Sequence, residues 1–342
     1  MTILIDINHP AHVHYFKNFY KLMTDEGHEI IIVARRKEIA QQLLDIYKTP
    51  YIDRGRGKES AIGKFVYLVY ADSKLYRIAR KFKPDIFLNF LHPYPSHIAF
   101  LMRKPSLVFS DTESAKLHHK LTVPFATKVF TPSCYTIDIG KKQVRFNSYM
   151  ELSYLHPNYF VPDDSILDTL NVKKGEKYVI LRFVSWKAAH DFGHKGMSLE
   201  NKRKTVEVLS KYAKVFITSE SELPEDLEKY RISISPERMH DAIYFSSLLF
   251  GESATMASEA AVLGTPSIFM DNEGRGYNTE QEKVYGLSFN FTESDQDQIH
   301  AINKAEEIIQ TDGSIFEEKR QKLLKDKDDL TQYMIKVVKE AI

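Results

Sequence analysis

The chain has 342 residues, of which 43% are apolar and 27% are charged, a balance typical of soluble globular proteins. Its 47 lysines and arginines against 46 aspartates and glutamates leave a net charge of +1, which excludes a general attraction for nucleic acid. The one cysteine, Cys134, excludes an intramolecular disulfide and a cysteine-based zinc site.

The length predicts two domains, because a domain usually has about 100 to 200 residues. The opening residues Met1–Asp6 carry neither a basic region nor a long apolar run, so we expect no signal peptide. No segment reaches the ~20 apolar residues needed to span a bilayer. We therefore expect a cytoplasmic protein.

In the first half of the chain, short runs of Ile, Val, Leu and Phe alternate with stretches of helical periodicity. The apolar runs lie at 2–5, 29–34, 85–88, 106–109 and 128–130, and helical stretches include 13–26, 39–47 and 62–82. This alternation predicts a parallel sheet wrapped by helices. We assign it to an N-terminal Rossmann-like domain over residues 1–160.

The first apolar run leads into a loop with three histidines, Asp-Ile-Asn-His-Pro-Ala-His-Val-His, residues 6–14. Ligands bind at the carboxyl ends of parallel strands, so we expect a site here. Histidine, with a pKa of about 6.5, can take a proton from a hydroxyl when a carboxylate orients it. His12 is the candidate base, and Asn8, His9 and His14 are candidate substrate contacts.

Two other interpretations of this loop stay open. His9 and His14 could simply cap or pack. The side chains of Asp6, His9, His12 and His14 could also bind a divalent metal, but their spacing matches no strong metal signature, so we expect no metal site.

The stretch 62–83 combines aromatic and aliphatic residues with six lysines and arginines at 64, 74, 77, 80, 81 and 83. A basic amphipathic helix of this kind can lie on an anionic membrane surface or contact a lipid-linked substrate. The alternative is a domain helix with a solvated basic face.

A cluster with two acidic residues, Ser-Asp-Thr-Glu-Ser at 110–114, follows the apolar run 106–109. Asp111 could orient His12, or Asp111 and Glu113 could perform acid–base chemistry themselves. The alternative is an ordinary helix N-cap, formed by Asp111 or Thr112.

Polar, proline-containing sequence at 155–177 predicts a link between domains, after which the α/β pattern returns. Apolar runs at 178–183, 215–218, 232–234, 248–250 and 267–270 predict a C-terminal Rossmann-like domain over 177–314. The charged, amphipathic stretch 315–342 is expected to pack back on the N-terminal domain. Two parallel sheets facing across a cleft would bury a ligand between the domains.

The loop after the run 178–183 carries cations, histidines and the single tryptophan. Lys187 or Lys195 could neutralise a diphosphate, and Trp186 and His190 are candidate substrate contacts. A solvated loop between domains is the alternative.

The most informative stretch is 251–266, Gly-Glu-Ser-Ala-Thr-Met-Ala-Ser-Glu-Ala-Ala-Val-Leu-Gly-Thr-Pro. Ser253 or Thr255 can cap a helix whose first N–H groups attract an anion, and Gly264 ends it. Glu259 could accept hydrogen bonds from ribose hydroxyls. An ordinary capped helix is the alternative.

Arg275 lies between two glycines and could clamp a phosphate or cap a turn. Neither a Walker-type motif nor a Gly-x-Gly-x-x-Gly fingerprint is present, which argues against a nicotinamide enzyme.

Together these motifs resemble the GT-B superfamily of nucleotide-sugar glycosyltransferases and the UDP-N-acetylglucosamine 2-epimerases. The segment 6–14 is similar to the opening of the bacterial and archaeal proteins called domain of unknown function 354, and the likeness covers the whole chain. The resemblance implies a catalytic base at His12, in Ala-His-Val where glycosyltransferases have Gly-His-Val, and its partner at Asp111. It implies diphosphate contacts for Ser253, Ala254, Thr255 and Met256, and a ribose contact for Glu259.

The epimerases share this C-terminal signature. Their His-Val-Glu-Ala sequence is matched in 111–114 only at Glu113, and their second-domain His-Arg-x-Glu-Asn loop is missing here. The sequence therefore favours a transferase over an epimerase.

We predict an inverting, metal-independent GT-B glycosyltransferase that transfers a sugar from a UDP-linked donor to a lipid-linked or saccharide acceptor. It needs no cofactor apart from the donor and could touch the inner membrane face through 62–83. The alternatives are a UDP-sugar 2-epimerase or hydrolase and a non-catalytic nucleotide-sugar-binding subunit.

Overall fold

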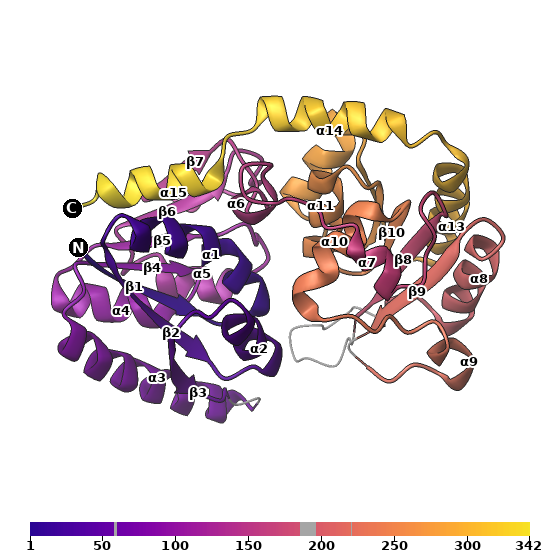
Figure 1. Ribbon diagram of the computed structural model, residues 1–342. Helices are drawn as coiled ribbons and strands as arrows, with labels where there is room; N and C mark the ends of the chain where they lie inside the picture. The colour runs from indigo at the N-terminus through magenta and orange to yellow at the C-terminus, as the bar shows by residue number, and fades with distance from the viewer. Residues whose placement is uncertain (58–59, 185–195, 220) are drawn as a thin grey trace. The chain divides into compact units, whose positions relative to one another are not determined.

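The computed structural model describes residues 1–57, 60–184, 196–219 and 221–342. It divides into two compact units (Figure 1). The first contains Met1–Tyr159 together with Asp328–Ile342, and the second contains Phe160–Lys327.

The first unit is built on a parallel sheet. Its strands are β1 (Thr2–Ile7), β2 (Glu29–Arg35), β3 (Tyr51–Gly55), β4 (Ile86–Phe90), β5 (Ser106–Phe109), β6 (Lys128–Pro132) and β7 (Gln143–Phe146). Its helices are α1 (Pro10–Asp25), α2 (Glu38–Ile46), α3 (Ala61–Phe82), α4 (Pro93–Met102), α5 (Lys116–Thr122), α6 (Leu152–Leu155) and α15 (Leu330–Lys339). The strand order is β3-β2-β1-β4-β5-β6-β7, and the direction of winding reverses between β1 and β4.

Helices cover the sheet of the first unit in two groups. α3, α4 and α5 pack side by side, whereas α1 packs against α2, α6 and α15 (Figure 1). Because strand side chains alternate between faces, Leu4 of β1 joins the core formed with α3 and α4, and Asp6, two residues later, faces the same side. The central strands are buried on both faces, as parallel strands usually are.

The second unit repeats this architecture on a smaller scale. Its strands are β8 (Tyr178–Phe183), β9 (Lys214–Ser219), β10 (Leu248–Gly251), β11 (Ser267–Met270) and β12 (Ser288–Phe291), in the order β12-β11-β10-β8-β9. Its helices are α7 (Ser165–Thr169), α8 (Leu199–Leu209), α9 (Glu225–Glu228), η1 (Pro236–Arg238), α10 (Met239–Phe245), α11 (Ala254–Leu263), α12 (Gly276–Glu280), η2 (Gln281–Tyr285), α13 (Asp295–Gln310) and α14 (Ser314–Asp326). Here the winding reverses between β8 and β10.

Helix α11 has the boundaries that its sequence predicts. Ser253 accepts a hydrogen bond from the Met256 N–H at 3.4 Å, and Gly264 ends the helix with a φ of 86°. The helix is thin enough for α14 to lie against it, and the buried Arg320 of α14 donates to the Val262 carbonyl.

The predicted α/β class is confirmed, but several elements differ from the sequence prediction. Residues 232–234 form no strand, and only an isolated bridge joins Ile217 to Arg231 beside them. Strands β3, β7 and β12 were not predicted; β3 holds charged residues, and the other two are short. The stretch 315–341 is two helices, because Asp329 caps a new helix by accepting from the Gln332 N–H at 3.1 Å.

Candidate functional site

Both sheets reverse their winding at a point where candidate residues follow the strands. In an open parallel sheet, the loops on either side of such a reversal separate and leave room for a ligand at the carboxyl edge. In the first unit these loops follow β1 and β4, and in the second they follow β8 and β10. The histidine loop follows β1, and the capped helix α11 follows β10.

His12 lies on the first turn of α1 and is buried. Its ring packs on Tyr15 and Phe90, with centroids 5.9 and 4.9 Å away, and lies 5.6 Å from the ring of His92. Burial lowers the pKa of His12 well below its usual value, and His9 and Lys37 lower it further. The imidazole is therefore neutral at pH 7.

Among the described residues, the group that contacts Nδ1 of His12 is the backbone N–H of Asn8, at 3.4 Å, and not the Asp111 carboxylate. A neutral imidazole that accepts at Nδ1 carries its proton on Nε2. The contact is longer than the usual 2.7–3.2 Å of an N–H hydrogen bond, so it holds this tautomer only weakly. The role predicted for Asp111 gains no support from this geometry.

The other residues predicted in the histidine loop make structural contacts. His9 is exposed and caps α1, because its Nδ1 accepts from the Ala11 N–H at 3.2 Å. His14 is buried against Tyr154, with ring centroids 5.3 Å apart. These are the capping and packing roles that the sequence left open, and substrate contacts for either residue stay predictions.

Asn8 belongs to a buried polar network that the sequence did not reveal. Its amide nitrogen donates to Asp6 Oδ2 at 2.5 Å, and its amide oxygen accepts from the Arg54 guanidinium. Arg54 and Asp6 form an ion pair of 3.2 Å, and both side chains are fully buried. Burial raises the pKa of Asp6, although Arg54 and Asn8 favour its ionised form. The signal that could have revealed this network is Arg54, a charged residue inside the run 51–55 that forms β3.

His92, which the sequence analysis did not select, extends the site across the winding reversal. It follows β4 and is the N-cap residue of α4, next to Leu91, whose φ of 40° is uncommon for leucine. Burial lowers the pKa of His92 well below its usual value, and His12, His118, Arg54 and Arg35 lower it further. Its ring lies 5.6 Å from that of His118.

Asp111 and Glu113 follow β5, one strand further along the sheet. Asp111 is buried and accepts from the Thr112 hydroxyl at 2.9 Å. Glu113 accepts from the Thr136 N–H at 3.3 Å. Neither residue caps a helix: the next helix, α5, begins at Lys116 with no capping side chain. Acid–base roles for both carboxylates stay predictions.

In the second unit, the first turn of α11 has the properties of an anion site. Ala254, Thr255 and Met256 are half-exposed, and the Met256 N–H is taken by Ser253. Within the described residues, the N–H groups of Ala254 and Thr255 donate to no acceptor. The positive end of the helix dipole adds to their attraction for an anion.

Glu259 is more deeply placed than a surface ribose contact would be. It is buried, and its Oε1 lies 3.0 Å from Nε2 of His240, which is also buried. Sequence patterns gave no sign of this pair, because His240 lies on α10, 19 residues earlier. The ribose contact of Glu259 stays a prediction.

Arg275, the predicted phosphate contact, is held by groups of its own loop. Arg275 donates to the Gly274 carbonyl at 2.6 Å and pairs with Glu273 and Asp271 at 3.5 and 3.9 Å, so its charge is balanced within its own loop. Trp186, Lys187, His190 and Lys195 lie outside the described residues.

Glu252, missed at the sequence level, is buried at the end of β10. It accepts from the N–H groups of Val184 and Met197, at 2.7 and 2.6 Å, and lies 3.8 Å from the Lys202 ammonium. One carboxylate thus fixes the backbone on both sides of segment 185–195.

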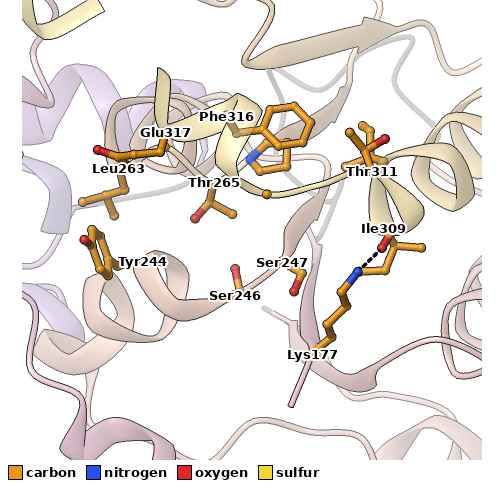
Figure 2. Close-up of a pocket in the computed structure, with 14 residues that line it drawn as sticks. Lys177, Tyr244, Ser246, Ser247, Leu263, Thr265, Ile309, Thr311, Phe316 and Glu317 are labelled. Atoms are coloured by element: carbon orange, nitrogen blue, oxygen red, sulfur yellow. Dashed lines mark hydrogen bonds between the residues drawn. The ribbon is translucent and has the colours of Figure 1, made fainter. Parts of the chain in front are cut away.

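The second unit also holds a cavity of about 280 Å³ at the opposite edge of its sheet (Figure 2). It lies where β8, β10 and β11 begin and where α11 ends, lined by Tyr244, Gly264 and Phe316 among others. Lys177 Nζ donates there to the Ile309 carbonyl at 2.6 Å (Figure 2). The cavity is therefore not the predicted donor site, which is at the start of α11.

Within the described ranges, no three His, Cys, Asp or Glu side chains are arranged to hold a metal ion. None of the helices in the described ranges is both long and apolar enough to cross a membrane.

Comparison with known proteins agrees with this architecture. An uncharacterized protein of Methanocaldococcus jannaschii is 23% identical over 283 residues, which cover 78% of this chain and 81% of the relative. The crystal structure of UDP-GlcNAc 2-epimerase from Neisseria meningitidis bound to UDP-GlcNAc matches with a TM-score of 0.70 and 13% identity, covering 99% of this chain and all of the other. The spinosyn rhamnosyltransferase SpnG, complexed with spinosyn aglycone, matches with a TM-score of 0.64 and 12% identity, covering 99% of each chain.

These likenesses show the fold of the GT-B glycosyltransferases and UDP-GlcNAc 2-epimerases, as the sequence motifs predicted. A family model described as "Protein of unknown function (DUF354)" matches residues 1–342. The chain therefore belongs to the DUF354 family.

Proposed function

We propose that this protein is a glycosyltransferase that binds a UDP-linked sugar at the first turn of α11 and transfers the sugar to an acceptor hydroxyl. The observation that carries the proposal is the pair of N–H groups on Ala254 and Thr255, which donate to no acceptor among the described residues and lie at the half-exposed positive end of a helix. A diphosphate supplies the charge and the acceptor oxygens that these groups attract.

The solved relatives support a nucleotide-sugar ligand. The Neisseria epimerase is bound to UDP-GlcNAc, and SpnG is a rhamnosyltransferase bound to its aglycone. By analogy with the epimerase, we infer that this protein binds a nucleotide-sugar donor, and by analogy with SpnG, that it binds an acceptor.

In this proposal, the first unit supplies the acid–base chemistry. His12 is neutral at pH 7 and so can accept the acceptor's proton, once the weak Asn8 contact gives way and the ring proton moves to Nδ1. The proton passes to the imidazole as the acceptor oxygen bonds to the sugar and the nucleoside diphosphate leaves. The α11 terminus stabilises the charge that develops on this leaving group without requiring a metal ion.

The test of donor binding is Ala254→Pro. Ala254 is the first residue of α11, where proline is favoured, and Ser253 has the extended backbone that a following proline requires, so only one N–H is lost. A hydrogen bond to a charged group contributes about 1.5–3 kcal/mol, so we expect calorimetry to show UDP affinity lowered by roughly ten- to a hundredfold.

Asp295→Pro is the matched control, because Asp295 is the exposed first residue of α13, after an extended Ser294. We expect it to bind UDP like the wild type. Equal UDP affinity in the two variants would rule out α11 as the phosphate site.

The second candidate function is sugar-nucleotide epimerisation, with Asp111 and Glu113 acting directly on the sugar. The epimerase match has the higher TM-score, 0.70 against 0.64 for the rhamnosyltransferase, which is the observation in its favour. Product analysis separates the two reactions. An epimerase or hydrolase alters the nucleotide sugar alone, a transferase requires an acceptor, and a binding subunit does neither.

The proposal includes peripheral contact with an anionic membrane, through the face formed by α3, α4 and α5. This face carries Val66, Val69 and Tyr70 of α3, Phe100 and Leu101 of α4, and Leu117 of α5, all exposed. Exposed cations lie on the same three helices or directly after them, at Arg77, Arg80, Lys81, Lys83, Arg103, Lys116 and Lys120. Apolar side chains among cations are the pattern of a surface that inserts shallowly into anionic lipid.

A further inference from the structure

We propose that the first unit holds a subsite for an anionic group, a phosphate or a carboxylate, built from Arg35 and Arg54 on an aromatic floor of Tyr67 and Tyr94. The inference rests on the proposed function in one respect: it takes the anion to be part of the acceptor.

Arg54 is a buried cation whose hydrogen bonds are incomplete. Its side chain is fully buried on β3, with the guanidinium 4.3 Å from the ring centroid of Tyr94 and 5.8 Å from that of Tyr67. Asp6 Oδ1 lies 3.2 Å from Nε and Asn8 accepts from Nη2, but within the described residues the buried Nε and Nη1 atoms have no hydrogen-bond partner. Leaving a buried charged donor without an acceptor costs free energy, so a bound group that accepts from this guanidinium would be stabilised.

Arg35 brings a second guanidinium to the same aromatic ring. Arg35 is the last residue of β2 and pairs with Gly55 of β3. The residue before it, Ala34, pairs with Ile7 at the end of β1. Its guanidinium lies 5.9 Å from the centroid of Tyr67, and its buried Nε has no hydrogen-bond partner within the part of the chain that the structure describes. Among the described residues, no carboxylate forms an ion pair with Arg35.

The backbone beside Arg35 is shaped to leave room for its guanidinium. A Cβ added at Gly57 would overlap the Nη2, Cζ and Nε atoms of Arg35. Glycine is therefore the residue that lets the backbone approach this cation closely.

Among the described residues, the charges around the two arginines do not balance. Asp6 offsets Arg54 alone, and the next arginine, Arg36, is already paired with Asp53. The positive potential extends to His92, whose pKa is lowered in part by both Arg54 and Arg35. An excess of positive charge with unsatisfied N–H donors attracts an anion and not a neutral sugar.

The position of the subsite relates it to the acceptor. Arg35 lies in register just beyond the β1 residues that lead into the histidine loop, and His92 follows β4 across the winding reversal. A ligand held at Arg35 through its anionic group would therefore lie at the same sheet edge as His12.

Calorimetric titration with glucose 1-phosphate, glucuronate and glucose tests the proposal. We expect the phosphate or the carboxylate sugar to bind and the neutral sugar not to bind. Arg35→Gln should weaken that binding by at least about tenfold, because it removes a charge-assisted, bidentate donor. Arg36→Gln, the exposed and already paired neighbour, should change it less than about twofold.

Gly57→Ala supplies a second variant that keeps every charge. The added methyl should push the Arg35 guanidinium aside and weaken anion binding as Arg35→Gln does, while circular dichroism shows the fold retained. Equal losses in Arg35→Gln and Arg36→Gln, or no binding of either anionic sugar to the wild type, would overturn the proposal.

The same titrations separate this subsite from the donor site. Anion binding that is lost in Ala254→Pro and retained in Arg35→Gln would assign the anion to α11 and overturn the subsite. Loss in Arg35→Gln with unchanged UDP affinity supports it, and this result would stand even if no sugar transfer were found.

Discussion

His12 and His92 are two imidazoles kept neutral by their surroundings. Burial is the main cause in both, and neighbouring cationic or potentially cationic side chains add to it. A neutral ring is the form that a general base needs, but a low pKa also weakens its affinity for the proton. In the proposed transfer, the imidazolium of His12 would therefore need stabilisation, and an anionic group held at Arg35 would provide it.

The pH dependence of transfer follows from the lowered pKa of His12. A base works only when unprotonated, so activity falls as the pH drops through its pKa. Burial lowers the pKa of His12 well below 6.5. We therefore expect kcat/KM to be constant as the pH is lowered past about 6.5, and to fall only at a pH well below that value. His12→Ala should lower kcat by about 10²- to 10⁴-fold.

His28→Ala, in a histidine outside the site, is the control for this pH profile and should leave kcat unchanged. An acid limb at or above pH ~6.5 in the wild type, or wild-type turnover in His12→Ala, would remove His12 from the role of base.

At the scale of elements, His97 forms hydrogen bonds that connect α3, α4 and α5. His97 of α4 hydrogen-bonds to Asp72 of α3 at 2.9 Å through Nδ1 and to the carbonyl of Leu121 in α5 at 3.0 Å through Nε2. Burial lowers the pKa of His97, but the hydrogen bond and attraction of Asp72, with the Leu121 carbonyl, outweigh it, and the pKa is raised. Both ring nitrogens then donate, as only a protonated ring can.

This contact predicts a pH-dependent contribution to stability. Because the folded pKa of His97 is raised, the stabilisation is complete below the unfolded pKa and is lost as the pH rises through the folded pKa. We expect His97→Gln to lower the free energy of unfolding of the first unit by about 1–2 kcal/mol near pH 5.5 and by much less near pH 9.

Hydrogen exchange of α3, α4 and α5 amides at the two pH values measures this difference. His300→Gln, exposed on α13 of the second unit, is the control. A loss of stability in His97→Gln that is the same at both pH values would show that the ring acts only by packing.

The sequence predicted those elements whose signals are local. Ser253 and Gly264 define α11 because capping and a left-handed residue depend on a few neighbouring atoms. Strand β3 was missed because Arg54 reads as a surface residue until Asp6, 48 positions earlier, is placed beside it. The pair of Glu259 with His240 was missed for the same reason. Contacts between residues distant in sequence decide what a side chain does, and no local pattern encodes them.

For the whole molecule, the α3–α4–α5 face predicts binding to anionic vesicles. Phe100 and Leu101 are each 64% exposed and lie beside the exposed Arg103. Burying two such side chains in the interface is worth about 1.5–3 kcal/mol each, so Phe100→Asp with Leu101→Asp should reduce vesicle binding by at least about tenfold.

Sedimentation with vesicles of anionic or of neutral lipid measures this effect. Val161→Asp is the matched control, because Val161 is 82% exposed and belongs to the second unit. Equal sedimentation of all three proteins, or no preference for anionic lipid, would refute membrane contact by this face.

The first unit is built from two segments that are far apart in the sequence, and this affects its folding during synthesis on the ribosome. α15 comes from the last residues of the chain, and its Tyr333 packs on Phe130 and Phe146 of β6 and β7, at 6.0 and 5.7 Å between ring centroids. The 168 residues of Phe160–Lys327 must all be translated before this helix emerges. The second unit, a continuous segment, can finish folding while the first still exposes the aromatic surface that α15 covers, so the part translated first is the last to be completed.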